Sequence, residues 1–359
     1  MSLKLKGNMK KLVSKLRGKK QPEQPAGRIT TDTLAEHREQ VLAGGRKFKY
    51  PVQYQRHRLV INAIIIGVAA LLLLVGMGWY MLYSAQNTSE FIYRVTKVVP
   101  VPVAVVDGQQ VRYDNYLMKY RSASHYLTEK EQIDPKTEDG KTQLNYVKSQ
   151  AMNDAIADAY ASKLANELDI EVTDADLETF LVQQRQASDG EVSEATYNAV
   201  ILDYYGWSPE EYRDAMHSKL LRQKVAYAVD RKAEEVAKSV ESKVTDSKAS
   251  LKAIANEINE DKASTVVYVP GAWVPKNNQD GGLAAAAGSL KKGQVSTAVK
   301  TSSGNGYYYV KLLDTSDTQL QYEYLFIPLN EFKAQLDKVK QDGKLTILIP
   351  VEDTLSVQE

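Results

Sequence analysis

The stretch LVINAIIIGVAALLLLVGMGWYML, Leu59–Leu82, decides the organisation of this chain because it contains no charged side chain. At a rise of about 1.5 Å per residue, a helix of this length spans the roughly 30 Å hydrocarbon core of a bilayer. Trp79, Tyr80 and Tyr83 gather at its C-terminal end, where amphipathic rings settle at a membrane interface. The pattern predicts a single transmembrane helix over residues 59–83. A buried helix of a soluble domain is the alternative, but such a helix is seldom apolar on every face over this length.

Charges on the two sides of this run predict its orientation. Residues 1–58 hold 15 basic and 4 acidic side chains, whereas the remainder of the chain holds 31 basic and 41 acidic ones. Basic flanks stay on the cytoplasmic side, so we expect a single-pass plasma-membrane protein with a cytoplasmic N-terminus and extracytoplasmic C-terminal domains. A cleaved signal peptide has a short basic region and an apolar core of about 7–15 residues. The segment before the apolar run, residues 1–58, and the run itself are both longer than that.

The basic N-terminal tail, residues 1–58, carries no recognisable chemistry. Residues 1–20 mix leucine and lysine, which favours an amphipathic segment on an anionic inner leaflet. A nucleic-acid-binding arm and a disordered tail that only orients the anchor are the alternatives, and we expect no nucleic-acid partner. The chain has no cysteine, which excludes disulfides, thiolate metal sites and a cysteine nucleophile. Residues 84–97 are polar and are predicted to form a linker or a continuation of the anchor helix.

Residues 98–230 are predicted to form a mostly helical domain that opens with a strand pair. Alternating valines from Val101 predict a strand, and Asp107-Gly108 a tight turn before a helix near Tyr113. Glu129 to Lys141 is charged and is predicted to be a loop. Helical spacing then predicts four further helices. They cover residues 144–168, a segment that begins after the cap Thr173, residues 193–205, and a segment that begins at the capping box of Ser208 and Glu211.

This order of elements, together with the segments LDIEVTDADL and YGWSPEEYRDAMHSKLLRQKV, resembles the N-terminal chaperone domain of the SurA/PrsA/PpiD-type foldases. The resemblance implies binding of unfolded or nascent extracytoplasmic polypeptides. A helical module rich in tyrosine also offers amphipathic grooves for such clients. The candidate client-binding side chains are Tyr116, Tyr120, Tyr160 and Phe180. The alternative is that these rings simply pack the core.

The remaining residues, 231–359, are predicted to form a small α/β domain with an antiparallel sheet, followed by a C-terminal helix and strand. The segment SLKKGQVSTAVKTSSGNGYYYVKLLD, Ser289–Asp314, resembles the end of a parvulin-type prolyl isomerase domain. Residues 322–329 are predicted to form a strand that would fill the position of the family's first strand from the C-terminal side, as in a circular permutation. The last strand, 345–349, is predicted to pair with it. The fold class is therefore α+β.

Parvulins place histidines on their first and last strands, and this domain departs from that pattern. Gly306-Tyr307 is followed by Tyr308 rather than histidine, and none of the chain's histidines falls in the domain. Prolyl isomerisation needs only a pocket that favours the twisted amide, so Tyr308, Trp273 and Tyr324 are the candidate catalytic side chains. The alternative is that these three side chains only pack in the core or on the surface of the sheet. No His/Asp/Glu cluster has metal-ligand spacing, and we expect neither a metal nor a cofactor.

The sequence thus favours a membrane-anchored chaperone that holds non-native secreted or membrane polypeptides without efficient catalysis. One alternative is an active membrane-anchored peptidyl-prolyl isomerase of parvulin type. Another is a cell-envelope scaffold that binds one folded partner. Suppression of aggregation across unrelated clients, catalysis on a proline-containing peptide, and a stoichiometric partner are the observations that separate these hypotheses.

Overall fold

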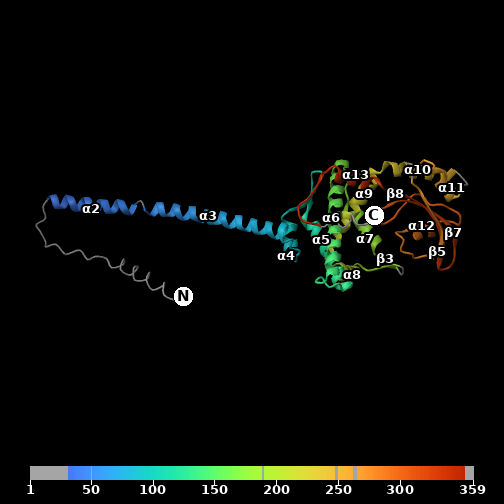
Figure 1. Ribbon diagram of the computed structural model, residues 1–359, viewed down its shortest axis with the longest axis horizontal. Helices are drawn as coiled ribbons and strands as arrows, with labels where there is room; N and C mark the ends of the chain where they lie inside the picture. The colour runs from blue at the N-terminus through green and yellow to red at the C-terminus, as the bar shows by residue number, and fades with distance from the viewer. Residues whose placement is uncertain (1–30, 50, 188–189, 247–249, 262–264, 352–359) are drawn as a thin grey trace. The chain divides into compact units, whose positions relative to one another are not determined.

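A computed structural model describes residues 31–49, 51–187, 190–246, 250–261 and 265–351. The predicted amphipathic segment at residues 1–20 lies outside this part of the chain. The described residues fall into two compact units that divide after Gly78. As predicted, the fold is α+β: mostly helical, with an antiparallel sheet toward the C-terminus (Figure 1).

The first unit is helical. It contains α2 (Thr31–Lys49) and most of α3 (Pro51–Trp79), after which the chain continues as a π-helical turn, η1 (Tyr80–Ser84). Over His57–Ser84 this continuous helix is long and apolar enough to cross a membrane. Helix α2 passes through Gly44 and Gly45, although such a pair often ends a helix. A helix tolerates an internal glycine at a cost of about 1 kcal/mol relative to alanine.

The second unit begins with a helical module. Its first part contains the predicted strand pair, β1 (Pro102–Val106) and β2 (Gln109–Arg112), between α4 (Glu90–Val98) and α5 (Tyr113–His125). The remaining elements are η2 (Tyr126–Lys130), α6 (Glu138–Leu168), α7 (Asp174–Gln184), the short pair β3 (Gln186–Ala187) and β4 (Gly190–Glu191), α8 (Glu194–Tyr205) and α9 (Pro209–Val229). The predicted caps are confirmed, since Thr173 begins α7 and the capping box of Ser208 and Glu211 begins α9.

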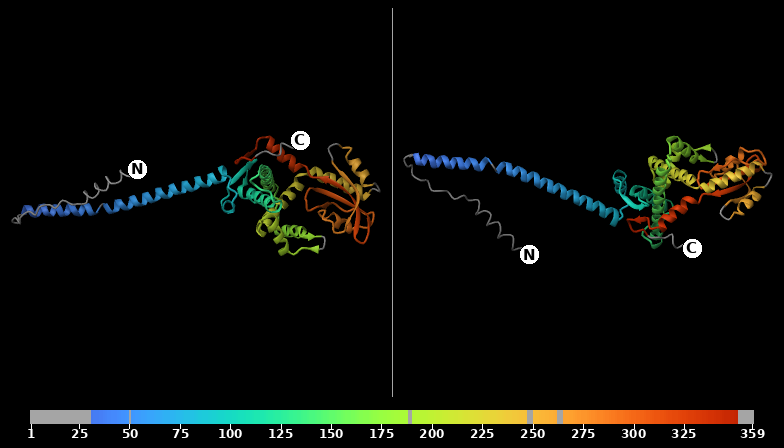
Figure 2. Two further views of the ribbon diagram at one scale, coloured as in Figure 1. Left: turned by 60° about the horizontal axis from the view of Figure 1, so that its bottom comes forward. Right: turned by 90° about the horizontal axis from the view of Figure 1, so that it is seen from above.

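The C-terminal segment packs into the core of this helical module. Helix α13 (Glu331–Gln341) and strand β9 (Leu345–Ile347) bury Leu336, Val339 and Ile349 among side chains of β1, β2, α5 and α6. Strand β9 extends the hairpin on its β1 side, with Leu348 N donating to Val103 O at 3.0 Å. The predicted pairing of residues 345–349 with 322–329 is therefore wrong. In Figure 2 the red C-terminal segment returns to the helical module.

Two further expectations on local structure need correction. Residues 84–97, predicted as a linker, contain most of α4, which buries Ile92, Tyr93 and Thr96. The predicted loop at 129–141 ends early, because α6 begins at Glu138 and includes Gly140. A Cβ on Gly140 would lie 2.0 Å from Asp134 O, so glycine is needed there for close approach of the backbone rather than for a turn.

A sheet domain follows α9. It consists of α10 (Arg231–Asp246), α11 (Leu251–Ile258), β5 (Val267–Pro275), α12 (Leu283–Gly288), β6 (Val299–Lys300), β7 (Gly306–Thr315) and β8 (Gln319–Pro328). The strands are antiparallel in the order β5-β8-β7-β6. Helices α10 and α11 pack on one face of the sheet and α12 on the other. The strand predicted at 322–329 therefore lies between β5 and β7.

One buried carboxylate ties the point where the chain leaves the helical module to the point where it returns. Asp230 Oδ1 accepts a hydrogen bond from Ala233 N at 2.9 Å at the start of α10. Its Oδ2 accepts from Asn330 N at 2.7 Å and Glu331 N at 3.1 Å at the start of α13. The sheet domain is thereby inserted between α9 and α13, with both of its ends held by the same side chain.

Candidate functional site

Helix α8 exposes large apolar side chains on both sides of its buried residue Ile201. The exposed side chains are Val200, Leu202, Tyr204 and Tyr205. Tyr126 of η2 is 36% exposed. The rings of Tyr126 and Tyr204 stack with centroids 6.5 Å apart. We call these five exposed residues the α8 surface. Soluble domains seldom expose neighbouring large apolar side chains unless the surface binds something.

A pocket of about 280 Å³ adjoins the α8 surface where α8 ends against α5. Tyr120, Tyr205 and Trp207 line it, and the rings of Tyr205 and Trp207 stack at 5.4 Å. Arg121 and Glu211 add charge to a lining that also contains Met118 and several hydroxyl-bearing side chains. The pocket therefore combines ring faces with charged groups, which suits contact with a peptide backbone and its side chains.

The local sequence explains how α8 docks at this place. Gly206 ends α8 with φ of 66°, a left-handed conformation that glycine adopts readily. A Cβ at Gly206 would lie 3.2 Å from the ring of His125, so its absence leaves room for that ring. His125 Nε2 lies 3.0 Å from Asp203 O, and Trp207 Nε1 donates to Met118 O at 3.3 Å. These contacts bind the end of α8 to α5.

The predicted client-binding residues divide between this site and the core. Tyr120 lines the pocket and stacks on Tyr116 at 6.1 Å. Tyr116 itself is buried, and burial raises the pKa of its hydroxyl. Tyr160 is buried against Phe332 of α13, with centroids 5.7 Å apart. Phe180 is also buried, beneath the Lys219 ammonium. The structure thus places only Tyr120 of this set at the pocket.

The exposed residues of the α8 surface were absent from the sequence-based candidates. The available signal was the run Tyr204-Tyr205-Gly206-Trp207, in which aromatic side chains flank a helix-ending glycine. Adjacent residues on a helix point in directions about 100° apart, so Tyr204 and Tyr205 could both be buried only along a wide apolar face. That pattern indicates that part of the run faces solvent.

Two of the three candidate catalytic residues meet on the α12 face of the sheet. The rings of Tyr308 and Tyr324 have centroids 5.7 Å apart, and Tyr308 stacks on Phe326 at 4.7 Å. The Tyr308 hydroxyl donates to Asn305 Oδ1 at 3.0 Å. Burial, and then the neighbouring Tyr308, raise the pKa of Tyr324. This cluster is well suited to packing and offers a ring surface next to one polar group.

Trp273, the third candidate, is separated from this cluster. It pairs in register with Gln321, whose chain neighbours Leu320 and Tyr322 pack on the α12 face. Successive side chains of a strand point to opposite faces, so Trp273 points away from Tyr308. Its side chain is 46% exposed.

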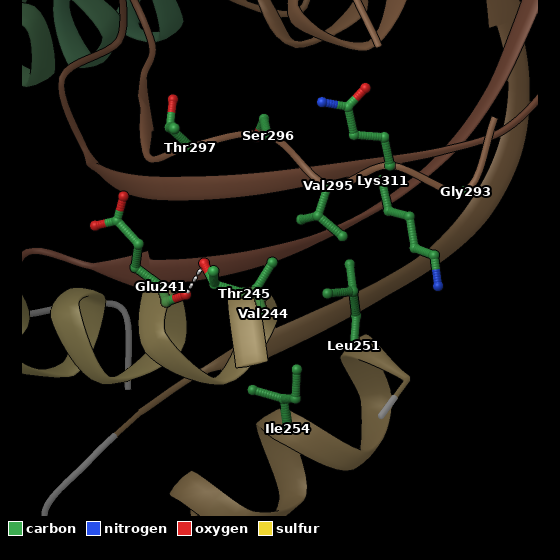
Figure 3. A pocket seen from close by; sticks show the side chains of 11 residues that line it. Glu241, Val244, Thr245, Leu251, Ile254, Gly293, Val295, Ser296, Thr297 and Lys311 are labelled. Atoms are coloured by element: carbon green, nitrogen blue, oxygen red, sulfur yellow. Dashed lines mark hydrogen bonds between the residues drawn. The ribbon is translucent and has the colours of Figure 1, made fainter. Parts of the chain in front are cut away.

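A larger pocket, of about 450 Å³, lies on the opposite side of the sheet domain (Figure 3). Val244, Leu251, Ile254 and Val295 give it apolar walls, whereas Glu241, Thr245 and Lys311 supply polar groups. Its lining, as far as the described residues define it, includes none of the three candidate catalytic side chains. Within the described ranges, no group of three or more histidine or acidic side chains could hold a metal ion.

These features define an α+β protein in which an apolar helix precedes a helical module with an exposed aromatic surface and an inserted sheet domain. Residues 53–226 match the family model of the SurA-like N-terminal domain, from within α3 to within α9. That segment, which contains the α8 surface and its pocket, is therefore similar to the SurA-like N-terminal domain. No curated protein and no solved structure gave a significant match.

Proposed function

We propose that this protein is a membrane-anchored extracytoplasmic chaperone that holds non-native secreted or membrane polypeptides on the α8 surface and in its adjoining pocket. The observation that carries the proposal is the group of exposed apolar and aromatic side chains on α8, within a segment similar to the SurA-like N-terminal domain. Chaperone-type folding is the function associated with such a domain.

The chemistry of the surface suits broad recognition. Ring faces and aliphatic side chains gain free energy from buried area without requiring a fixed pattern of hydrogen bonds. A client that exposes any apolar segment can therefore bind, and affinity remains weak because few contacts are specific. Lys130 lies 5.0 Å from the Tyr204 ring centroid and pairs with Asp203 at 2.6 Å, so the charge beside the aromatic group is already balanced.

The domain roles follow from the position of the apolar helix. Residues 1–58 form the basic cytoplasmic tail, 59–83 cross the plasma membrane, and the remainder is extracytoplasmic. The helical module supplies the client surface from 98–230, completed by 331–351, and the inserted sheet domain adds a binding-only module.

Because the chain lacks cysteine, Leu202→Cys can be labelled in intact cells by a membrane-impermeant thiol reagent. Labelling supports this orientation, and labelling only after the membrane is opened contradicts it.

Aggregation of two unrelated denatured clients, followed by light scattering with the full chain in lipid nanodiscs, tests the client surface. Leu202→Ser should reduce protection several-fold, whereas Leu168→Ser at the end of α6 should leave it unchanged. The two leucines are 56% and 47% exposed, so the pair matches in chemistry and accessibility. An equal loss of protection against aggregation in both variants, or no loss in either, would contradict the proposal. Capture of one folded partner with no effect on denatured clients would favour the scaffold alternative.

A second candidate function, prolyl isomerisation, is favoured by the aromatic cluster of Tyr308, Tyr324 and Phe326 beside the Asn305 side chain. An apolar ring surface beside a side-chain amide, whose NH2 group can donate a hydrogen bond, is the kind of site in which a twisted prolyl amide could be stabilised. The test is a cis/trans assay on a proline-containing peptide with the full chain. Acceleration that Tyr308→Ala abolishes and Trp273→Ala retains would support catalysis on the α12 face. A rate equal to that of the uncatalysed peptide would leave the sheet domain with binding alone.

A further inference from the structure

Helix α4 carries an apolar stripe that its own domain leaves uncovered. Phe91, Val95 and Val98 recur at the spacing of one helix face, and Phe91 and Val98 are 68% and 83% exposed. The opposite face buries Ile92 and Tyr93 in the core of the helical module. The helix is therefore apolar on both faces, although only one of them has a protein partner in the described structure.

The end of the apolar helix belongs to the same core. Leu82 is buried there, and its carbonyl oxygen accepts a hydrogen bond from the Tyr113 hydroxyl at 2.7 Å. The Tyr83 hydroxyl donates to Pro102 O, also at 2.7 Å. The last residues of the proposed membrane span are thus part of the core of the folded domain.

The connection to α4 keeps that helix close to the span. Asn87 N donates to Met81 O at 2.9 Å, so the chain doubles back to the level of a residue inside the apolar run. Helix α4 begins three residues later at Glu90, capped by Ser89. Three residues reach at most about 10 Å, so the start of α4 lies within that distance of Asn87. The head-group region of a bilayer is itself roughly 5–8 Å deep on each side.

Basic side chains border the stripe. Arg94 and Lys97 lie on α4 between its apolar residues, and the Arg94 side chain is largely exposed while paired with Glu90 one turn earlier. Lys97 forms a long ion pair with Asp214, at 3.7 Å, and its ammonium lies 5.8 Å from the Tyr93 ring centroid. Long basic side chains can bury their stems against apolar surface and extend their charges to lipid phosphates. Apolar residues flanked by arginine and lysine are typical of helices that lie in the membrane interface.

We propose that the exposed face of α4, formed by Phe91, Val95 and Val98, inserts into the boundary between lipid head groups and acyl chains. This inference rests on the proposed membrane anchoring and adds a second point of attachment. One transmembrane helix leaves a domain free to rotate about its anchor, whereas an interfacial helix fixes which side of the domain faces the bilayer. The α8 surface is thereby held at a set orientation.

The absence of cysteine allows a direct test in the full chain. Single variants Leu72→Cys, Val98→Cys and Leu202→Cys, each carrying an environment-sensitive fluorophore, are reconstituted in vesicles of zwitterionic and anionic phospholipid. Nitroxide quenchers are placed either at the head group or deep in the acyl chain. The label at Leu72 should lose most of its emission to the deep quencher, and the label at Val98 should lose most of its emission to the shallow quencher. The label at Leu202 should be affected by neither.

Each other result has a definite meaning. Quenching at Leu72 with none at Val98 overturns this inference while the anchor stands. No quenching at Leu72 overturns the anchoring on which the inference rests. A blue-shifted but unquenched label at Val98 would show that protein covers the stripe instead of lipid. As a further check, Phe91→Asp should abolish shallow quenching of the label at Val98, whereas Leu168→Asp should not.

Discussion

The return of the C-terminal segment to the helical module makes a sharp prediction for Leu336 on α13. Its side chain is 7% exposed and packs in the same core as β1 and α5. Truncating a buried leucine to alanine costs about 2–5 kcal/mol, so Leu336→Ala should destabilise this core by about 3 kcal/mol. Since about 1.4 kcal/mol corresponds to a tenfold change, amide exchange through opening of the module should rise about a hundredfold.

Hydrogen exchange followed by mass spectrometry locates the effect. Peptides covering 102–125 should lose protection, whereas those covering β7 and β8 should keep theirs. Lys333→Ala, on the exposed side of the same helix, should change stability by less than about 0.5 kcal/mol. If Leu336→Ala instead weakened the sheet domain and spared the strand pair, α13 would belong to the sheet domain, and the inserted arrangement would be refuted.

Three further predictions concern single side chains. Asp230→Ala removes the hydrogen-bond acceptor shared by the starts of α10 and α13, so two helix N-termini lose a cap. The free energy of unfolding, measured in urea, should fall by about 2 kcal/mol. Gly140→Ala should destabilise α6 by about 1–3 kcal/mol in the same assay, although alanine normally favours a helix, because its Cβ would meet Asp134 O at 2.0 Å. The hydrogen bond from Lys163 lowers the pKa of Asp107, so Asp107 stabilises the fold above its unfolded-state pKa of about 3.9 and loses this effect as the pH falls further. Asp107→Asn should therefore flatten the acid limb of the stability profile.

Each of these has a contrary outcome. Equal stability of Asp230→Ala and the parent chain would mean that water replaces the carboxylate at both helix starts. A gain in stability for Gly140→Ala would mean that the chain before α6 moves aside at little cost. An unchanged acid limb for Asp107→Asn would assign the acid sensitivity of this protein to other carboxylates.

Local signals made much of the secondary structure predictable. The charge-free run specified the apolar helix, and the Asp107-Gly108 turn specified the hairpin, because each depends on residues adjacent in the chain. The capping box at Ser208 and Glu211 marked the start of α9 for the same reason. The α+β class follows from such elements taken together.

Long-range pairing was not predictable in the same way. Strand β9 pairs with β1, more than two hundred residues earlier, although β8 is much nearer in sequence. A short apolar strand carries no mark of which edge it will join, and the choice depends on where α13 packs.

The predicted linker failed for a different reason. Helix α4 places Phe91, Val95 and Val98 at helical spacing, but its polar residues masked that period.

The tyrosines show why composition alone could not locate the candidate site. The chain has 22 tyrosines and 5 phenylalanines, a bias that suggested aromatic client binding. Some of these rings instead fill the cores while their hydroxyls donate to backbone carbonyls, as Tyr113 does to Leu82 O and Tyr309 to Ala237 O. A buried ring with one polar atom can join elements that a phenylalanine could only pack against. The exposed rings of the α8 surface are a different population, and only the three-dimensional packing of α8 against α5 separates them from the buried ones.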